Sequence, residues 1–465
     1  MRSRWFLTST LLIGAWALGA GITGCSKKTT APKPPAERVN EYKPNANARI
    51  TSQTILGDAD KKTDFGYIQR ADDASLGFRG VYNSSAGVGV LNAGGSLRWL
   101  QAGTTGSVNV STLPGNAIVP NGLVAVGGHD TDGDGKLDVG YASLYSSAGR
   151  LLSQVPVTSD SSDVWFYRLV SVAHSTFIAC GGERRSGVEH PLLALQHLRA
   201  PGVIERGRTV TLQGITGYFN DVATLPSPPG ELSFAATSRS GASGSFGGSS
   251  TVHRLRAPWP GFDPVAVEWS REIVPPTGSW VLLNDLEEAG GNLYVAGIVN
   301  DNRKPAPSGG AWTSGLAASY TGSGDLRWVT TDSLTQRDDG IYRIVMGPDA
   351  LYAVDIAAEY YSGSDREWFG YGLISKLDLN TGRVIANFTL GQDRYRSLFY
   401  TATWTASGLI CGGVTESEVV GGPFRGWFST VDVSGTMPAP AAARRGAPDL
   451  DAAPGPTRGW DREFR

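Results

Sequence analysis

The sequence predicts an all-β fold, a seven-bladed β-propeller made of four-stranded antiparallel blades. The 465-residue chain holds 61 Gly and 26 Pro but only 18% charged residues, a balance typical of many short strands joined by turns. The segment 280–331 contains four apolar runs of strand length, as expected of an antiparallel meander. Such a sheet buries both faces only by stacking on copies of itself.

The second run of this unit recurs along the chain and gives the number of copies. It reads 293–298 in the unit itself, and similar apolar runs occupy 76–81, 123–128, 177–182, 232–237, 351–356 and 409–414. If Gly80, Gly127, Gly181, Ala236, Gly297, Asp355 and Gly412 are equivalent, the period is about 55 residues, as in long propeller blades. Several of these runs are apolar on both faces, which predicts inner strands covered on both sides by neighbouring blades.

A tight turn before the fourth strand is the other repeated mark. It begins with Gly and continues into Trp or an aliphatic residue at 95–99, 149–152, 324–328 and 382–385. A large apolar residue at the start of an outer strand suits packing on the next blade. We therefore expect these outer strands to pack on the neighbouring blade.

The two ends of the repeat region predict how the ring closes. The last copy contains only three strands, 398–406, 409–414 and 426–433, whereas 49–56 precedes the first copy and alternates like a strand. We expect 49–56 to supply the outer strand of blade seven, which removes two sheet edges. The propeller domain is thus predicted to span residues 49–436.

The N-terminal segment has the pattern of a secretory signal. Arg2 and Arg4 precede the apolar stretch 5–20, and Ile22-Thr23-Gly24-Cys25 resembles the bacterial lipobox. The resemblance implies that residues 1–24 are a signal peptide, that Cys25 carries the lipid, and that the Pro/Lys-rich 25–48 is a tether. Ser26 resembles the outer-membrane sorting signal of Gram-negative lipoproteins. We expect a lipid-anchored envelope protein, at the outer rather than the inner membrane, facing either the periplasm or the surface.

Composition excludes several function classes. The net charge of −2 and the lack of a basic stripe predict no nucleic-acid partner. The three cysteines form no CxxC or zinc-like spacing, and Cys180 and Cys411, near-equivalent in their copies, are interpreted as buried small hydrophobes. No GxSxG, HExxH or phosphate-binding loop is found, so no catalytic residue is assigned. The Pro/Ala-rich 437–465 is predicted to be a disordered tail.

One local motif predicts a metal site. The run from His129 to Asp138 places Asp130, Asp132 and Asp134 at alternating positions, and Asp138 follows four residues later. Carboxylates spaced in this way around a Gly-permitted turn can surround Ca²⁺, with Lys136 contributing its backbone carbonyl. The motif resembles the calcium loops of integrin-type propellers. The expected role of Ca²⁺ is structural, and the alternative is an acidic hairpin without metal.

Long polar insertions separate the second and third strands of blades two to seven, at 129–138, 183–190, 238–250, 300–310, 357–368 and 415–425. Equivalent hairpins of a meander project from one face of a ring, where variation can build a binding surface. The recognition-type residues of this face would be Glu183, Arg184, Arg185, Trp312, Tyr360, Tyr361, Arg366, Trp368 and Arg425. Solvated loops with incidental aromatic residues are the alternative.

These features together suggest a family and a function. The repeats resemble those of secreted bacterial β-propellers, and 374–385 is similar to the third-to-fourth-strand turn of quinoprotein-like propellers. The resemblance implies fold more than function. We expect a scaffold that binds an envelope protein or polysaccharide through its loop-rich face. The alternative is an envelope enzyme, an oxidoreductase or carbohydrate-active protein, with its site at the central channel. Ionisable side chains converging there would favour the enzyme, and an apolar or aromatic loop face the binder.

Overall fold

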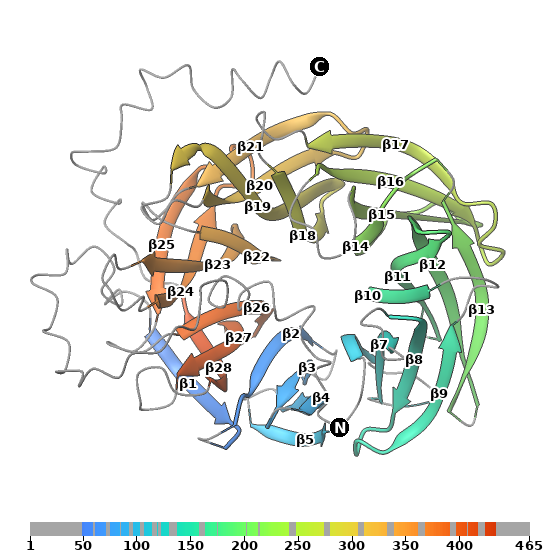
Figure 1. The fold of residues 1–465 in the computed structure, drawn as a ribbon, viewed down its shortest axis with the longest axis horizontal. Helices are drawn as coiled ribbons and strands as arrows, with labels where there is room; N and C mark the ends of the chain where they lie inside the picture. Colours follow the sequence, from blue (N-terminus) through green and yellow to red (C-terminus); the bar gives the residue numbers. More distant parts are fainter. Residues whose placement is uncertain are drawn as a thin grey trace, which may run out of the picture.

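The protein is a ring of seven four-stranded antiparallel sheets around a central axis (Figure 1). The computed structural model describes residues 49–433 except for short segments, the longest of which are 130–136, 241–247, 361–367 and 417–423. The regular elements of the described residues are all strands, and none of those residues form a helix long and apolar enough to cross a membrane. The predicted seven-bladed propeller is therefore confirmed.

In blades one to three the strands follow one another from the axis to the rim (Figure 1). Blade one contains β2 (Asp64–Arg70), β3 (Leu76–Tyr82), β4 (Ser85–Leu91) and β5 (Leu97–Ala102). Blade two contains β6 (Ser107–Leu113), β7 (Gly122–His129), β8 (Val139–Tyr145) and β9 (Leu151–Val157). Blade three contains β10 (Asp163–Ala173), β11 (Thr176–Arg185), β12 (Val188–Arg199) and β13 (Val203–Thr211).

Blades four to six repeat this order. Blade four contains β14 (Tyr218–Leu225), β15 (Glu231–Arg239), β16 (Ser250–Pro258) and β17 (Ala266–Ile273). Blade five contains β18 (Trp280–Ala289), β19 (Asn292–Pro305), β20 (Ala311–Thr321) and β21 (Leu326–Asp332). Blade six contains β22 (Asp339–Met346), β23 (Leu351–Tyr360), β24 (Trp368–Leu377) and β25 (Val384–Leu390).

Blade seven joins the two ends of the repeat region. Its inner strands are β26 (Ser397–Thr405), β27 (Gly408–Glu416) and β28 (Phe424–Asp432), and its outer strand is β1 (Arg49–Leu56), the first strand of the chain. β1 pairs antiparallel with β28 from Arg49 opposite Asp432 to Leu56 opposite Gly426. The predicted closure by residues 49–56 is confirmed, so the ring is fastened by main-chain hydrogen bonds between its ends.

Each of the seven interfaces between neighbouring blades has its own apolar cluster. Strand β11 shows how one strand serves two of them. Phe177 and Ala179 pack with blade two, whereas Ile178 and Cys180 pack with blade four. Cys180 and Cys411 are buried, free and in different clusters, as predicted. The apolar character of the second strands on both faces thus follows from their burial between two blades.

A bulge at the same place in every first strand explains the repeated glycine of the second strand. Opposite the residue that precedes the bulge lie Gly80, Gly181, Gly297 and Gly413, where an added Cβ would lie 1.9–2.0 Å from a first-strand carbonyl oxygen. The side chain is excluded because the bulged backbone occupies its space. The register also corrects the alignment: Ser238 and Gly413 occupy this position, not Ala236 and Gly412.

At the rim, tryptophans of the outer strands pack against the next blade. Trp328 of β21 packs against Gly382 in the last turn of the next blade, where an added Cβ would lie 2.3 Å from the indole ring. Its Nε1 donates to the carbonyl oxygen of Leu379 at 3.1 Å. Trp99 and Trp269 pack on turn glycines in the same way. The predicted packing of these outer strands on the neighbouring blade is confirmed, and the structure adds that the contact is made with the last turn of that blade.

Candidate functional site at the propeller axis

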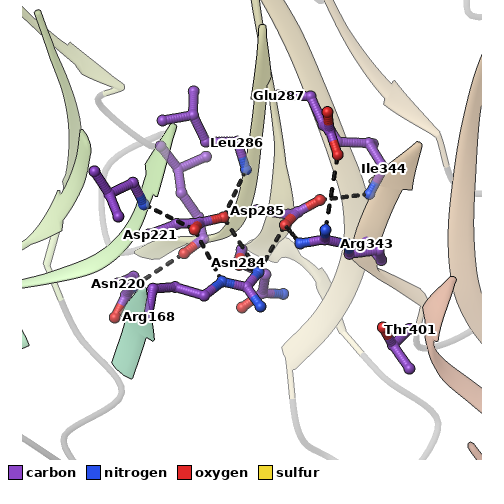
Figure 2. Close-up of polar contacts among 12 residues, drawn as sticks. Arg168, Asn220, Asp221, Asn284, Asp285, Leu286, Glu287, Arg343, Ile344 and Thr401 are labelled. Carbon is purple, nitrogen blue, oxygen red and sulfur yellow. Dashed lines mark hydrogen bonds and ion pairs between the residues drawn. The ribbon is translucent and has the colours of Figure 1, made fainter. Parts of the chain in front are cut away.

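The residue that follows each first-strand bulge lies at an equivalent position around the axis. These residues are Tyr67, Asn109, Arg168, Asp221, Asp285, Arg343 and Thr401. The side chain of Asn109 lies outside the described part of the chain. Blades three to six therefore contribute two arginines and two aspartates at one level of the ring, and Figure 2 shows that these four side chains meet.

A continuous ion-pair network joins blades three to six. Arg168 Nε donates to Asp221 Oδ1 at 2.8 Å, and Arg168 Nη2 donates to Asp285 Oδ1 at 2.7 Å (Figure 2). Arg343 Nη1 donates to the same oxygen of Asp285. Asp285 is fully buried, and the side chains of Arg168 and Arg343 are only 10% and 13% exposed. The charges are thus neutralised in pairs inside the ring.

The same carboxylates also bind the backbone of the next blade. Asp221 Oδ2 accepts a hydrogen bond from the N–H of Leu286 at 2.9 Å, and Asp285 Oδ2 accepts one from Ile344 at 2.8 Å. In blade seven the Thr401 hydroxyl accepts the equivalent hydrogen bond from Ile68 of blade one at 3.1 Å. Each acceptor satisfies a buried N–H that the bulged strand cannot pair within its own sheet.

The bulged residues add a further link where they are asparagines. Asn220 Nδ2 donates to the carbonyl oxygen of Leu283 at 3.0 Å, and Asn284 Nδ2 donates to that of Ile341 at 2.9 Å. In both cases the acceptor belongs to the first strand of the following blade. An Asn-Asp pair therefore binds both an acceptor and a donor of its neighbour, which fixes the register between the two sheets.

Tyr67 of blade one contacts the network from the far side of the axis. The Cζ atoms of Arg168 and Arg343 lie 4.4 and 5.2 Å from its ring centroid. Strand β2 is a neighbour of neither β10 nor β22 in the ring, so these contacts cross the centre (Figure 1). A guanidinium over an aromatic face is attracted by the ring's negative potential. The two arginines thus connect blade one to blades three and six.

The electrostatics of the network depend on all of its members. Burial raises the pKa of Asp285, and the positive charges of Arg343 and Arg168 oppose that shift. Burial lowers the pKa of Arg168, but Asp221, Tyr67 and Asp285 outweigh it, so the pKa is raised overall. Removing one carboxylate would leave a buried guanidinium without its partner, which is the costly case for a buried ion pair.

These contacts hold neighbouring blades together. Asp221 Oδ1 accepts from Arg168 Nε and from the N–H of Val222 at 2.7 Å, and its Oδ2 accepts from Arg168 Nη2 and Leu286. A general base must direct a free lone pair toward the proton that it removes. Both oxygens of Asp221 are already occupied, so the chemistry available at this level is hydrogen bonding by arginine donors.

The arginines predicted for the binding face are found in two separate places. Arg184 forms ion pairs of 3.0 Å with both Asp163 and Glu189. Arg185 is paired with the buried Glu183 at 2.8 Å, and 44% of its side chain remains exposed. These arginines lie on blade three, whereas Arg425 on blade seven donates from Nε to the carbonyl oxygen of Gly57 and supports ring closure. The structure does not bring Arg425 together with Arg184 and Arg185.

The remaining predicted face residues belong to strands or loops whose side chains are not described. Trp312, Tyr360 and Trp368 lie in β20, β23 and β24, but only their backbone is within the described part of the chain. Tyr361 and Arg366 lie outside the described residues, as do Cys25 and its tether. Their roles stay predictions.

Most of the predicted calcium loop also lies outside the described residues, namely Asp130, Asp132, Asp134 and Lys136. Asp138 is described: its N–H donates to the carbonyl oxygen of His129, and its own carbonyl accepts from Val164. Where the structure describes the chain, no group of three or more His, Cys, Asp or Glu side chains could hold a metal. The calcium prediction is untested.

The axis network was missed because the sequence analysis followed the second strands. A signal was present in the first strands, where two dipeptides recur: Tyr-Arg at 167–168 and 342–343, and Asn-Asp at 220–221 and 284–285. Residues of opposite charge at equivalent positions of neighbouring inner strands would have predicted a buried network at the axis.

Comparisons with known proteins identify no family. No protein-family model matches the chain, and no curated protein matches it. Among solved structures, the polysaccharide lyase Uly1 is 7% identical with a TM-score of 0.46, covering 83% of this chain and 99% of the lyase. The β-propeller domain of Nup133 from Vanderwaltozyma polyspora is 8% identical with a TM-score of 0.43, covering 81% and 99%. Drosophila semaphorin 1a, domains 1 and 2, is 9% identical with a TM-score of 0.41, covering 82% and 88%.

Proposed function

We propose that this chain is a lipid-anchored cell-envelope scaffold that binds a protein or polysaccharide through the face formed by its second-to-third-strand connections. The observation that carries the proposal is the concentration of long polar insertions in one topological position. Five of these connections span 130–138, 240–249, 306–310, 361–367 and 417–423. In a ring of identical meanders they all project from the same end, which separates a variable surface from an invariant frame.

The described part of this face supports a recognition role. In blade three, β11 and β12 continue to a two-residue turn at Ser186 and Gly187, whose φ angles are 50° and 81°. Positive φ at both positions gives the tight turn that matches strand twist. The turn presents Arg185 and the 48%-exposed Val188 to solvent. A rigid hairpin with a charged and an apolar residue at its tip has the mixed character of recognition surfaces.

The enzyme alternative rests on a specific observation, the convergence of ionisable side chains at the axis. Its carboxylates are engaged with arginines and backbone N–H groups of neighbouring blades. Carboxylates used in this way stabilise the ring, and the oxygens of Asp221 and Asp285 are already engaged and not directed at a substrate. We therefore favour the binding scaffold over an envelope oxidoreductase or carbohydrate-active enzyme.

The anchor and the calcium loop have supporting roles in this proposal. Lipid on Cys25 would hold the propeller at the membrane, proposed to be the outer membrane, and residues 25–48 would act as the spacer. Ca²⁺ bound by Asp130, Asp132, Asp134, Asp138 and the Lys136 carbonyl would order one connection of the binding face.

A capture experiment tests the binding face. The full chain would be compared with a variant whose five long connections are shortened, using envelope extract as the source of partners. We expect the wild type to retain a defined protein or polysaccharide that the variant loses. The control shortens the third-to-fourth-strand connection 259–265 on the opposite end of the ring, and it should retain the partner. If the shortened variant still captured the partner, the binding-face proposal would be wrong, and the enzyme alternative at the axis would be favoured.

The anchor and the metal are tested separately. Cys25→Ser should abolish lipid labelling and release the protein from the membrane fraction, while a Ser26→Thr control keeps both. Titration calorimetry of the full chain should show calcium uptake at or below millimolar concentration, and Asp132→Asn with Asp134→Asn should remove it. Absence of uptake by the wild type would refute the metal assignment.

A further inference from the structure

Arg79 occupies a position that no other blade gives to a charged residue. It lies in β3 directly opposite Tyr67, the residue after the bulge. The equivalent residues of the other second strands are small or apolar: Val126, Cys180, Thr237, Ala296, Val354 and Gly412. A charge between two packed blades carries a desolvation cost, which is retained only where something compensates it.

The guanidinium of Arg79 lies over the bulge of blade one. At Gly66, the bulged residue, an added Cβ would lie 3.2 Å from Arg79 Nη2 and 3.4 Å from Cζ. Blades four and five have Asn220 and Asn284 at this position, whose side chains bind the neighbouring blade. In blade one the missing side chain leaves room for the arginine head at the same level of the axis.

Arg79 forms no hydrogen bond or ion pair with any described residue, and its Nε is buried without a partner. The acid that acts on it electrostatically is Asp64, which is ion-paired with Lys62 at 3.3 Å. Arg168 and Arg343 are paired with Asp221 and Asp285. The Nε of Arg343 is nevertheless also buried without a hydrogen-bond partner. Two guanidinium Nε donors therefore lack an acceptor among the described residues, and the buried Oδ2 of Asp64 contacts only Lys62.

Both unpartnered donors belong to arginines that neighbour Tyr67. Arg79 faces Tyr67 in the sheet register, and the guanidinium of Arg343 lies 5.2 Å from the Tyr67 ring. Arg79 is only half-buried, so a solute can reach it. The pKa of Arg79 is lowered to about 10, mainly by burial and also by nearby Arg168, against the opposing effects of Asp64 and Tyr67. At neutral pH the group remains cationic in a site where its charge is unfavourable.

We propose that the axis of the propeller binds a small oxyanion, a carboxylate or a phosphate, with Arg79 as its principal ligand and Arg343 Nε as a second donor beside Tyr67. A planar guanidinium donates two parallel hydrogen bonds to such a group, and partial burial strengthens them. An anion here would neutralise the cation that lacks an ion pair. The site is separate from the loop-rich face, so its test is independent of the scaffold proposal.

The test compares anions at matched ionic strength. The full chain is titrated with inorganic phosphate, with acetate and with chloride, and binding is followed by calorimetry and by the melting temperature. We expect saturable binding of phosphate or acetate, and no binding of chloride. The arm that binds identifies the oxyanion class. Arg79→Met keeps the apolar stem, and its affinity should fall about tenfold or more because a charge-assisted contact is lost.

Two further variants separate a bound anion from general effects. Arg208→Met removes one charge from an exposed side chain at the rim, and it should bind the anion like the wild type. Gly66→Ala leaves every charge in place but puts a methyl group against the Arg79 guanidinium, and it should weaken binding. If Arg79→Met does not fold, Gly66→Ala provides the decisive comparison. Equal stabilisation of wild type, Arg79→Met and Gly66→Ala by phosphate, or no saturable binding by the wild type, would overturn the proposal.

Discussion

Two arcs of the ring hold neighbouring blades together at the same level by different means. In blades three to six an ion-pair network adds to the apolar packing: Asp221 is paired with Arg168, and Asp285 is shared by Arg168 and Arg343. Between blades seven and one the contact is aromatic: Phe65 stacks on Phe428 at 4.6 Å, and Phe78 meets the edge of Phe65 at 4.8 Å. The only matching polar link there, within the described residues, is Thr401 to Ile68.

The common requirement of both arcs is a buried backbone N–H. The bulge presents an N–H at Leu286, Ile344 and Ile68, and the preceding blade supplies an acceptor to each. A hydroxyl group can accept this hydrogen bond without any charged partner. A carboxylate brings a charge into the interior, which then requires arginines. The charged residues of the ionic arc therefore depend on one another, because a buried carboxylate is stable only with its arginine partners.

Removing the strand that closes the ring should have the largest effect. Deletion of residues 49–56 exposes β28 and opens blade seven, which belongs to the aromatic arc. Because that strand contributes a full ladder of main-chain hydrogen bonds and the packing of Ile50 and Ile55, we expect loss of the cooperative thermal transition. Calorimetry measures it. An unchanged melting transition would show that closure is not needed for the stability of the ring.

Within the ionic arc, Asp285→Ala should cost about 3–5 kcal/mol of unfolding free energy, because it removes the carboxylate that the buried guanidinium groups of Arg168 and Arg343 share. Urea denaturation measures the loss. The double variant Asp285→Ala with Arg343→Met should lose less than Asp285→Ala alone, since one unpaired charge is removed with its partner. A larger loss in the double variant would show that the residues contribute independently.

The stability of the protein should also decrease at acidic pH because of His253 in blade four, which belongs to the ionic arc. Burial lowers the pKa of His253 from 6.5 to about 4, and its ring nitrogens lie 2.7 and 2.8 Å from the hydroxyls of Ser238 and Ser270. The unfolded chain binds the proton first, so stability is complete above about pH 6.5 and falls as the pH drops to about 4. The expected loss is about 3 kcal/mol.

The measurement is urea denaturation between pH 7 and pH 4, with His253→Gln as the comparison. Glutamine does not titrate in this range, so the variant should be less stable at pH 7 but lose less stability on acidification. Parallel profiles for the two proteins would mean that the acid sensitivity arises elsewhere.

In the aromatic arc, Thr401→Val should have the smallest effect, about 1–2 kcal/mol, because it leaves the N–H of Ile68 without an acceptor but introduces no unpaired charge. Thr401→Ser is the matched control and should retain most of the stability. A loss as large as that of Asp285→Ala would contradict the distinction between the two arcs.

The sequence by itself determined the repeat and the closure of the ring. Apolar runs identify the second strands, and most of these runs hold a glycine at one position. The register shows that the bulge opposite this position leaves no room for a side chain at Gly297. The three-strand last copy and the strand-like 49–56 predicted their own pairing. These features could be predicted because each depends on a short stretch of chain, where apolar periodicity and turn residues act locally.

Only the tertiary structure decided which side chains meet at the axis. Arg168, Asp221, Asp285 and Arg343 come from four different blades, and each is separated from the next by a complete meander. Arg425 Nε donates to the carbonyl oxygen of Gly57, a contact that exists only because β28 pairs with β1. Neither outcome follows from local patterns, because the contacts depend on the closed geometry of seven sheets and on the bulge that turns one residue of each first strand toward the next blade.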